Sequence, residues 1–69
     1  SGGEVTARAV LLLVDLDKEI RDASKGDLSL DNVTRGLMRL DKVTTKDFIE
    51  VSENVLRGPS KVLQSKLLR

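Results

Sequence analysis

The chain has 69 residues, with twelve Lys plus Arg against eleven Asp plus Glu, and it contains neither His nor Cys. It therefore has no disulfide and no ordinary zinc ligands, so a single small core must stabilise it. The net charge of +1, the interleaved signs and the single aromatic residue, Phe48, exclude the usual nucleic-acid binders. The longest apolar run, Ala9 to Val14, is far shorter than the roughly 20 residues that span a bilayer, so no membrane partner is expected.

Four segments have the pattern of helices, and no segment has the alternation of a strand. The predicted helices cover about residues 5–24, 30–40, 45–57 and 60–68. Residues 1–3, Ser-Gly-Gly, are predicted to be a flexible N-terminal remnant, and residues 4–69 a single helical domain. The sequence therefore predicts an all-α fold, a small bundle of three to four helices.

The first predicted helix is unusually apolar. Its main stripe recurs at three- and four-residue steps and consists of Ala9, Leu12, Leu13, Leu16, Ile20 and Ala23. Val10, Leu11 and Val14 add apolar side chains on the flanks of this stripe. A helix of this kind is either central in its domain or lacks a neighbour. Two interpretations stay open: the third and fourth helices cover Val10, Leu11 and Val14, or these residues face a partner.

Polar side chains mark the starts of the later helices. The predicted N-caps are Ser29, Thr44 and Ser60. Asp47 stands three residues after Thr44, which is the spacing of a capping box. The last helix ends at the end of this chain and is expected to fray.

Glycines mark the ends of two helices. Gly26 is predicted to adopt the left-handed conformation just past the first helix, and Gly58 to be the C-cap glycine of the third, followed by Pro59. Gly36 lies inside the second helix, where glycine costs about 1 kcal/mol relative to Ala. At that position it would allow close approach of another backbone.

The densest group of ionisable side chains also lies on the first helix. It comprises Asp15, Asp17, Glu19 and Asp22. All but Asp17 are predicted to lie opposite the main apolar stripe. Lys18 and Arg21 are within one turn, so that Asp15 is expected to pair with Lys18 and Asp17 with Arg21. This arrangement favours a solvated, mutually neutralised face over a pair of catalytic carboxylates.

The alternate spacing of Asp15, Asp17 and Glu19 also resembles the first ligands of an EF-hand calcium loop. Ile20 stands where that loop requires Gly, however, and Gly26 where it requires a bidentate Glu. The serines have no His to activate them. We therefore predict no catalytic, cofactor-binding or metal-binding residue in this chain and give an independent enzyme little weight.

A resemblance to a known family rests on the segment from Arg8 to Asp31, which reads RAVLLLVDLDKEIRDASKGDLSLD. This segment resembles the C-terminal helical part of the catalytic region in the glycyl aminopeptidase family of zinc metallopeptidases. That family typically shows a Lys-Gly step, an aliphatic helix ending in Ile-Arg or Leu-Arg, a small-residue break and then Ser-Leu-Asp-Asp-Val. The corresponding positions here are Arg8-Ala9, Ile20-Arg21, Gly26 and Ser29-Leu30-Asp31-Asn32-Val33. The later Thr44-Thr45-Lys46-Asp47-Phe48 is similar to the family's next helix start, and Gly58 to the glycine that follows it.

The resemblance implies a helical scaffold beside a zinc site, with Ala9 to Val14 facing the rest of the catalytic domain. The family's His-Glu-x-x-His helix and its downstream Glu ligand belong upstream of this stretch, so the resemblance places no catalytic residue here. The first functional hypothesis is therefore a non-catalytic segment of an aminopeptidase-like hydrolase, whose partner is the remainder of a parent protein. The alternative is a self-standing interaction or dimerisation module that binds a second helical protein. The substrate of any parent enzyme, the compartment and the oligomeric state stay open.

Overall fold

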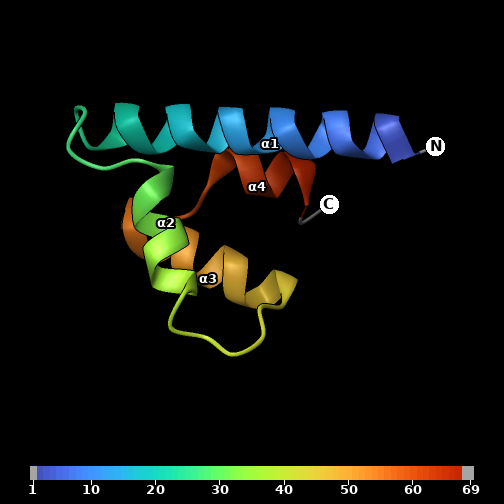
Figure 1. The fold of residues 1–69 in the computed structure, drawn as a ribbon. Coiled ribbons are helices and arrows are strands. Elements are labelled where there is room, and N and C mark those ends of the chain that lie inside the picture. Colours follow the sequence, from blue (N-terminus) through green and yellow to red (C-terminus); the bar gives the residue numbers. More distant parts are fainter. Residues whose placement is uncertain (1, 68–69) are drawn as a thin grey trace.

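The fold consists of helices joined by short loops. The structure is a computed structural model that describes residues 2–67. Its helices are α1 (Gly2–Ala23), α2 (Leu30–Leu37), α3 (Thr45–Leu56) and α4 (Lys61–Lys66). No strand occurs within residues 2–67, so the predicted small all-α bundle is confirmed. Figure 1 shows α1 as a long rod along one side of the molecule, with α4 against it and α2 and α3 farther out on the same side.

Three helix bounds differ from those predicted. α1 begins at Gly2, so Gly2 and Gly3 belong to its first turn rather than to a flexible remnant. α2 ends at Leu37 instead of near residue 40. Beyond that point Met38 is 76% and Leu40 41% exposed, so a further helical turn would not be stabilised by burial of these side chains. α4 ends at Lys66, and the last residue of its predicted range, 68, lies outside the described residues.

The predicted N-caps are confirmed. Each accepts a hydrogen bond from an amide of the first turn of its helix: Ser29, Thr44 and Ser60. The capping box of α3 is complete, because the amide of Thr44 donates to Oδ2 of Asp47 over 3.0 Å and the amide of Asp47 donates to Oγ1 of Thr44 over 3.1 Å. The Thr44 amide, followed by its hydroxyl, lowers the pKa of Asp47 below its ordinary value. The starts of these helices are thus fixed by local chemistry.

The end of α1 is a Schellman motif. Lys25 and Gly26 both have positive φ angles, 53° and 85°. The amide of Gly26 donates to the carbonyl of Arg21 over 2.8 Å, and the amide of Lys25 donates to that of Asp22 over 3.4 Å. The left-handed Gly26 was predicted, whereas the left-handed Lys25 was not.

The end of α3 corrects the prediction for Gly58. The left-handed residue there is Arg57, with a φ of 63°, whereas Gly58 does not have a positive φ. The amide of Gly58 closes the helix end by donating to the carbonyl of Glu53 over 3.1 Å. Since a residue that precedes proline favours extended backbone, Pro59 moves the left-handed position one residue earlier than the glycine.

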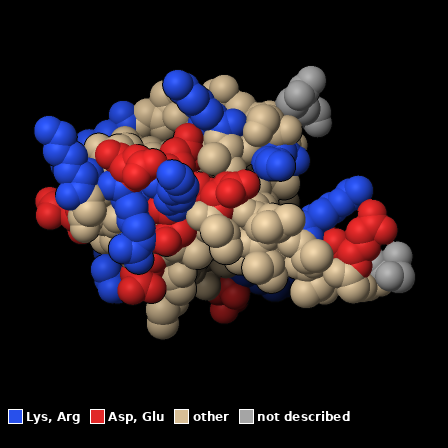
Figure 2. Space-filling view, turned by 90° about the horizontal axis from the view of Figure 1, so that it is seen from above, with Lys and Arg blue, Asp and Glu red and all other residues tan. Residues whose placement is uncertain are grey.

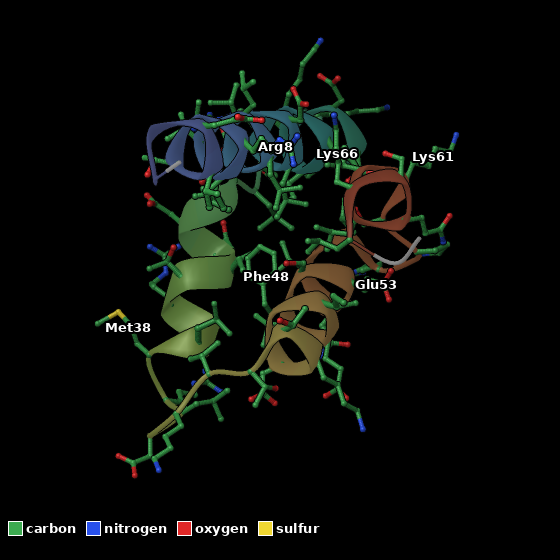
Figure 3. All side chains as sticks on the ribbon, turned by 90° about the vertical axis from the view of Figure 1, so that its right-hand side faces the viewer. Arg8, Met38, Phe48, Glu53, Lys61 and Lys66 are labelled. Carbon is green, nitrogen blue, oxygen red and sulfur yellow. The ribbon has the colours of Figure 1, made fainter. Side chains whose placement is uncertain are left out.

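A small apolar core lies between the helices. Its fully buried members come from α1, α2 and α4: Leu16, Ile20, Val33 and Leu63. Partly buried apolar side chains surround them, and Figure 3 shows one of these, Phe48, pointing from α3 into the space between the helices. Because so few side chains are fully buried, the core alone contributes little stability. Hydrogen bonds between the helices therefore add to the stability of the fold.

The contact between α2 and α3 depends on Gly36. A Cβ atom at this position would lie only 2.7 Å from Cγ1 of Val51. Glycine therefore lets α3 approach α2 closely, as predicted, although the atom that fills the space belongs to a side chain rather than to a backbone. The cost of glycine within a helix is offset by this packing.

Candidate interaction surface

The outward side of α1 carries an exposed apolar surface. Val10 is 53%, Leu11 61% and Val14 57% exposed, whereas Leu16 and Ile20 are fully buried. With 3.6 residues per turn, Leu11 and Val14 point about 140–160° away from the direction of these core side chains, and Val10 about 100° away. α3 and α4 therefore do not cover Val10, Leu11 and Val14, which stay more than half exposed. The other interpretation, that these residues face a partner, stays a prediction.

These residues belong to a regular pattern. With Ala7 they occupy positions i, i+3, i+4 and i+7 of one helix face, the spacing by which helices pack against partners. We call Ala7, Val10, Leu11 and Val14 the outer stripe. Figure 2, seen from above α1, shows uncharged surface over much of the N-terminal half of this helix, with acidic and basic side chains crowded at the other end. The outer stripe is thus an apolar face next to a charged one.

The charged part of α1 is organised by pairs four residues apart. Arg21 Nε lies 2.8 Å from Asp17 Oδ2, which confirms the predicted pair. Lys18 Nζ lies 3.8 Å from Asp22 Oδ2 rather than against Asp15, so the predicted pair of Asp15 with Lys18 is wrong. The reason is geometric, because a Lys side chain can reach back or forward along the helix, and here the carboxylate one turn later is nearer.

Asp17 also joins α1 to α2. Its Oδ1 accepts a hydrogen bond of 2.8 Å from the amide of Leu30, the first residue of α2. This amide, followed by the Arg21 guanidinium, lowers the pKa of Asp17 below its ordinary value, and the hydrogen bond from Arg21 to Asp17 raises the pKa of Arg21. Asp17 therefore acts as a cap for a helix other than its own.

Glu19 corrects the prediction of a solvated face. Instead of lying opposite the core stripe, its half-buried side chain spans from α1 to the start of α4. Oε1 accepts a hydrogen bond of 2.6 Å from the Ser60 hydroxyl, and Oε2 accepts one of 2.7 Å from the Lys61 amide. A carboxylate at a helix N-terminus is favoured by the unpaired amides and by the helix dipole. Glu19 therefore fixes α4 to α1.

Ser60 lies at the centre of this connection. It is fully buried, its amide donates to Oε2 of Glu53 over 2.9 Å, and its hydroxyl both donates to Glu19 and accepts from the Leu63 amide. A helical-wheel projection of α1 could have placed Glu19 beside Leu16 and Ile20, at the border of the apolar stripe. It could not have identified Ser60 as the partner, since the two residues are 41 positions apart.

Two acidic residues of α1, Asp17 and Glu19, have structural roles as contacts to α2 and to the start of α4. Within residues 2–67, no three His, Cys, Asp or Glu side chains are placed so that they could hold a metal ion. Asp15, Asp17 and Glu19, whose spacing resembles the first ligands of a calcium loop, lie on the continuous helix α1, and the oxygens of Asp17 and Glu19 accept hydrogen bonds from amides, a guanidinium and a hydroxyl. None of the described helices has an apolar stretch of the length that a bilayer crossing requires. The outer stripe is thus the feature that most needs a functional explanation.

A second apolar area adjoins the inner edge of α1. An open hollow between α1, the start of α3 and the end of α4 is lined mainly by apolar side chains, among them Leu13, Phe48 and Leu67. Leu13 and Leu67 are each 38% exposed there. The N-terminal half of α1 is therefore only partly covered by the bundle even on its core side.

No family model, curated protein or solved structure matches this chain.

Proposed function

We propose that this chain is a non-catalytic helical interaction module, which docks onto another protein surface through the outer stripe of α1. The observation that carries the proposal is the exposure of Val10, Leu11 and Val14, by 53 to 61%, on one face of a regular helix. Large apolar side chains grouped on one face mark a site of association more often than apolar residues scattered singly over a surface.

The energetic argument is one of magnitude. Complete burial of a Val or Leu side chain contributes about 1.5–3 kcal/mol, so covering three half-exposed side chains contributes about 3–5 kcal/mol in total. That gain is modest compared with the cost of association. The docked surface must therefore extend beyond the three residues, to Ala7 and to the aliphatic stems of neighbouring charged side chains.

The resemblance to the glycyl aminopeptidase family suggests one form of this function. In that form the chain is a scaffold beside the zinc site, and the outer stripe packs against the remainder of a metallopeptidase-like protein. The support is the order of motifs from Arg8 to Asp31 together with the uncovered face of α1. A longer natural chain without His-Glu-x-x-His upstream of Ser1 would refute this form, while docking through the outer stripe would stand.

The test uses the absence of cysteine from these 69 residues, because an introduced thiol is then unique within them. Leu11→Cys places a thiol on the outer stripe, and Met38→Cys places one at a residue that is 76% exposed after α2. Each variant is labelled with a maleimide in cells that produce the protein natively and, separately, as dilute purified protein. We expect the ratio of the labelling rate at position 11 to that at position 38 to be several-fold lower in the cell than in dilute solution.

Equal relative labelling at the two positions in the cell and in dilute solution would contradict the proposal. It would mean that the outer stripe stays in contact with water wherever the protein occurs. Circular dichroism of both purified variants serves as the control for folding.

A further inference from the structure

A hollow lies between the N-terminal half of α1 and the end of α4. It has a volume of about 500 Å³, and its apolar lining consists of Ala9, Leu11, Leu12 and Leu67. A volume of this order, a mainly apolar lining and a few polar groups at the edge are the usual features of a small-molecule site. Such sites also occur between the helices of bundles. We call this space the α1–α4 hollow.

The charged residues that line the α1–α4 hollow are both basic, Arg8 from α1 and Lys66 from α4. Within residues 2–67, no Asp or Glu is part of its lining. Both basic side chains are exposed, and Figure 3 shows them close to each other where α1 and α4 meet. The hollow therefore combines an apolar wall with a positively charged edge, which is complementary to an apolar molecule with one anionic group.

The guanidinium of Arg8 is available to such an anion. Its ion pair with Glu4, over 3.3 Å, lies on the surface of α1, where the two side chains are 79% and 67% exposed. Exposed pairs of this kind contribute little stability and exchange readily with other charged groups. An anion at the edge of the hollow can thus bind Arg8 without disrupting the fold.

The size of the α1–α4 hollow favours a slender ligand over a partner helix. On α1 it extends from Arg8 to Leu12, which is about 6 Å at 1.5 Å per residue, whereas a helix with its side chains is about 10–12 Å wide. The open hollow at the start of α3 adjoins it and shares Ala9, Leu12 and Leu67 with it. Two small apolar spaces in succession suit a flexible alkyl chain.

We propose that the α1–α4 hollow binds the anion of a long-chain fatty acid as a single molecule. The carboxylate lies between Arg8 and Lys66, and the alkyl chain follows the apolar lining toward Phe48. A guanidinium can donate two parallel hydrogen bonds to a carboxylate, and an ammonium adds a second positive charge. Each methylene group that leaves water adds to the affinity. This binding goes beyond the proposed docking function, although Leu11 belongs both to the hollow and to the outer stripe.

Titration with dodecanoate, below the concentration at which it forms micelles, tests the proposal. The readout is methyl NMR of the Leu and Val side chains in the purified chain. We expect saturable shifts of the Leu12 and Leu67 methyl resonances. Butyrate, which has the same head group without the long chain, and dodecylammonium, which has the same chain with the opposite charge, should not produce saturable shifts at these concentrations.

Charge-removing variants test the position of the carboxylate. Arg8→Gln and Lys66→Gln should each weaken dodecanoate binding about two- to fivefold, and the double variant about tenfold, because each change removes one exposed positive charge. Lys18→Gln is the matched control on α1. It also removes an exposed cation that is paired within its helix, to Asp22 over 3.8 Å, and it should leave binding unchanged. Circular dichroism shows whether each variant keeps its helices.

Several outcomes would overturn the inference. Dodecanoate could cause no saturable shift, dodecylammonium could bind equally well, or Lys18→Gln could weaken binding as much as Arg8→Gln. Shifts of the same methyl resonances with protein concentration alone would make a second copy of this chain the occupant. Cosedimentation with phosphatidylglycerol vesicles without binding of dodecanoate would make a bilayer surface the ligand. Either result would refute the fatty-acid site, while the labelling at position 11 tests the docking function separately.

Discussion

The contact between Glu19 and the start of α4 gives the sharpest prediction on stability. In Glu19→Gln, one carboxylate oxygen becomes an amide nitrogen, which cannot accept a hydrogen bond. The Ser60 hydroxyl and the Lys61 amide, at 2.6 Å and 2.7 Å from the two oxygens, then compete for one acceptor. A lost hydrogen bond to a charged group costs about 1.5–3 kcal/mol, and because Glu19 is only half-buried, water replaces part of it. We expect a loss of about 2 kcal/mol in the free energy of unfolding.

The assay is urea unfolding followed by circular dichroism, with Glu50→Gln on the exposed face of α3 as the matched control. For a domain of this size the loss corresponds to a decrease of about 8–16 °C in Tm. In a double-mutant cycle with Ser60→Ala, the two changes should cost clearly less together than the sum of their separate costs, because they remove the same contact. If Glu19→Gln is no more destabilising than Glu50→Gln, the carboxylate does not hold α4 in place and the reasoning is refuted.

Three further predictions concern single residues. Ser52 is fully buried and its hydroxyl has no partner within the described structure, so Ser52→Ala should raise the free energy of unfolding by about 1 kcal/mol; a loss of stability would show that the hydroxyl is satisfied. Arg57 has a left-handed backbone conformation, which is unfavourable for residues other than glycine. Arg57→Gly should therefore stabilise the chain by about 0.5–1 kcal/mol in the same urea assay, and a loss of stability would contradict this prediction. Asp17 has a lowered pKa when folded, so its contribution is present above the ordinary Asp value of 3.8 and is lost as the pH falls through the folded-state pKa. Asp17→Asn should therefore flatten the decline of stability with acid more than Asp15→Asn does, as urea unfolding at several pH values will show; equal effects would argue against the hydrogen bond to α2.

Local chemistry predicts where the helices begin. Ser29, Thr44 and Ser60 were identified as N-caps because each needs only an amide two or three residues later, and the structure confirms all three. The helix ends depend on the rest of the fold. The apolar spacing up to Leu40 predicts a longer α2, but burial decides whether a short helix continues, and burial depends on the other helices.

The acidic residues of α1 show the limit of a reading confined to one helix. Asp17 and Glu19 look like members of a solvated charge pattern, since neighbours of opposite sign lie within one turn. In the structure their oxygens cap α2 and α4, 13 and 41 residues away. By contrast, Val10, Leu11 and Val14 could be singled out in advance, because an apolar side chain on the flank of an already apolar helix has no local explanation.

The most direct test of the central claim, that the outward side of α1 is a docking surface, is the relative maleimide reactivity of Leu11→Cys in the cell and in dilute solution. The account predicts that the thiol at position 11 is shielded in the cell and reactive in dilute solution, while Met38→Cys reacts rapidly in both. A thiol at position 11 that reacts as fast as the one at position 38 in both settings would contradict it.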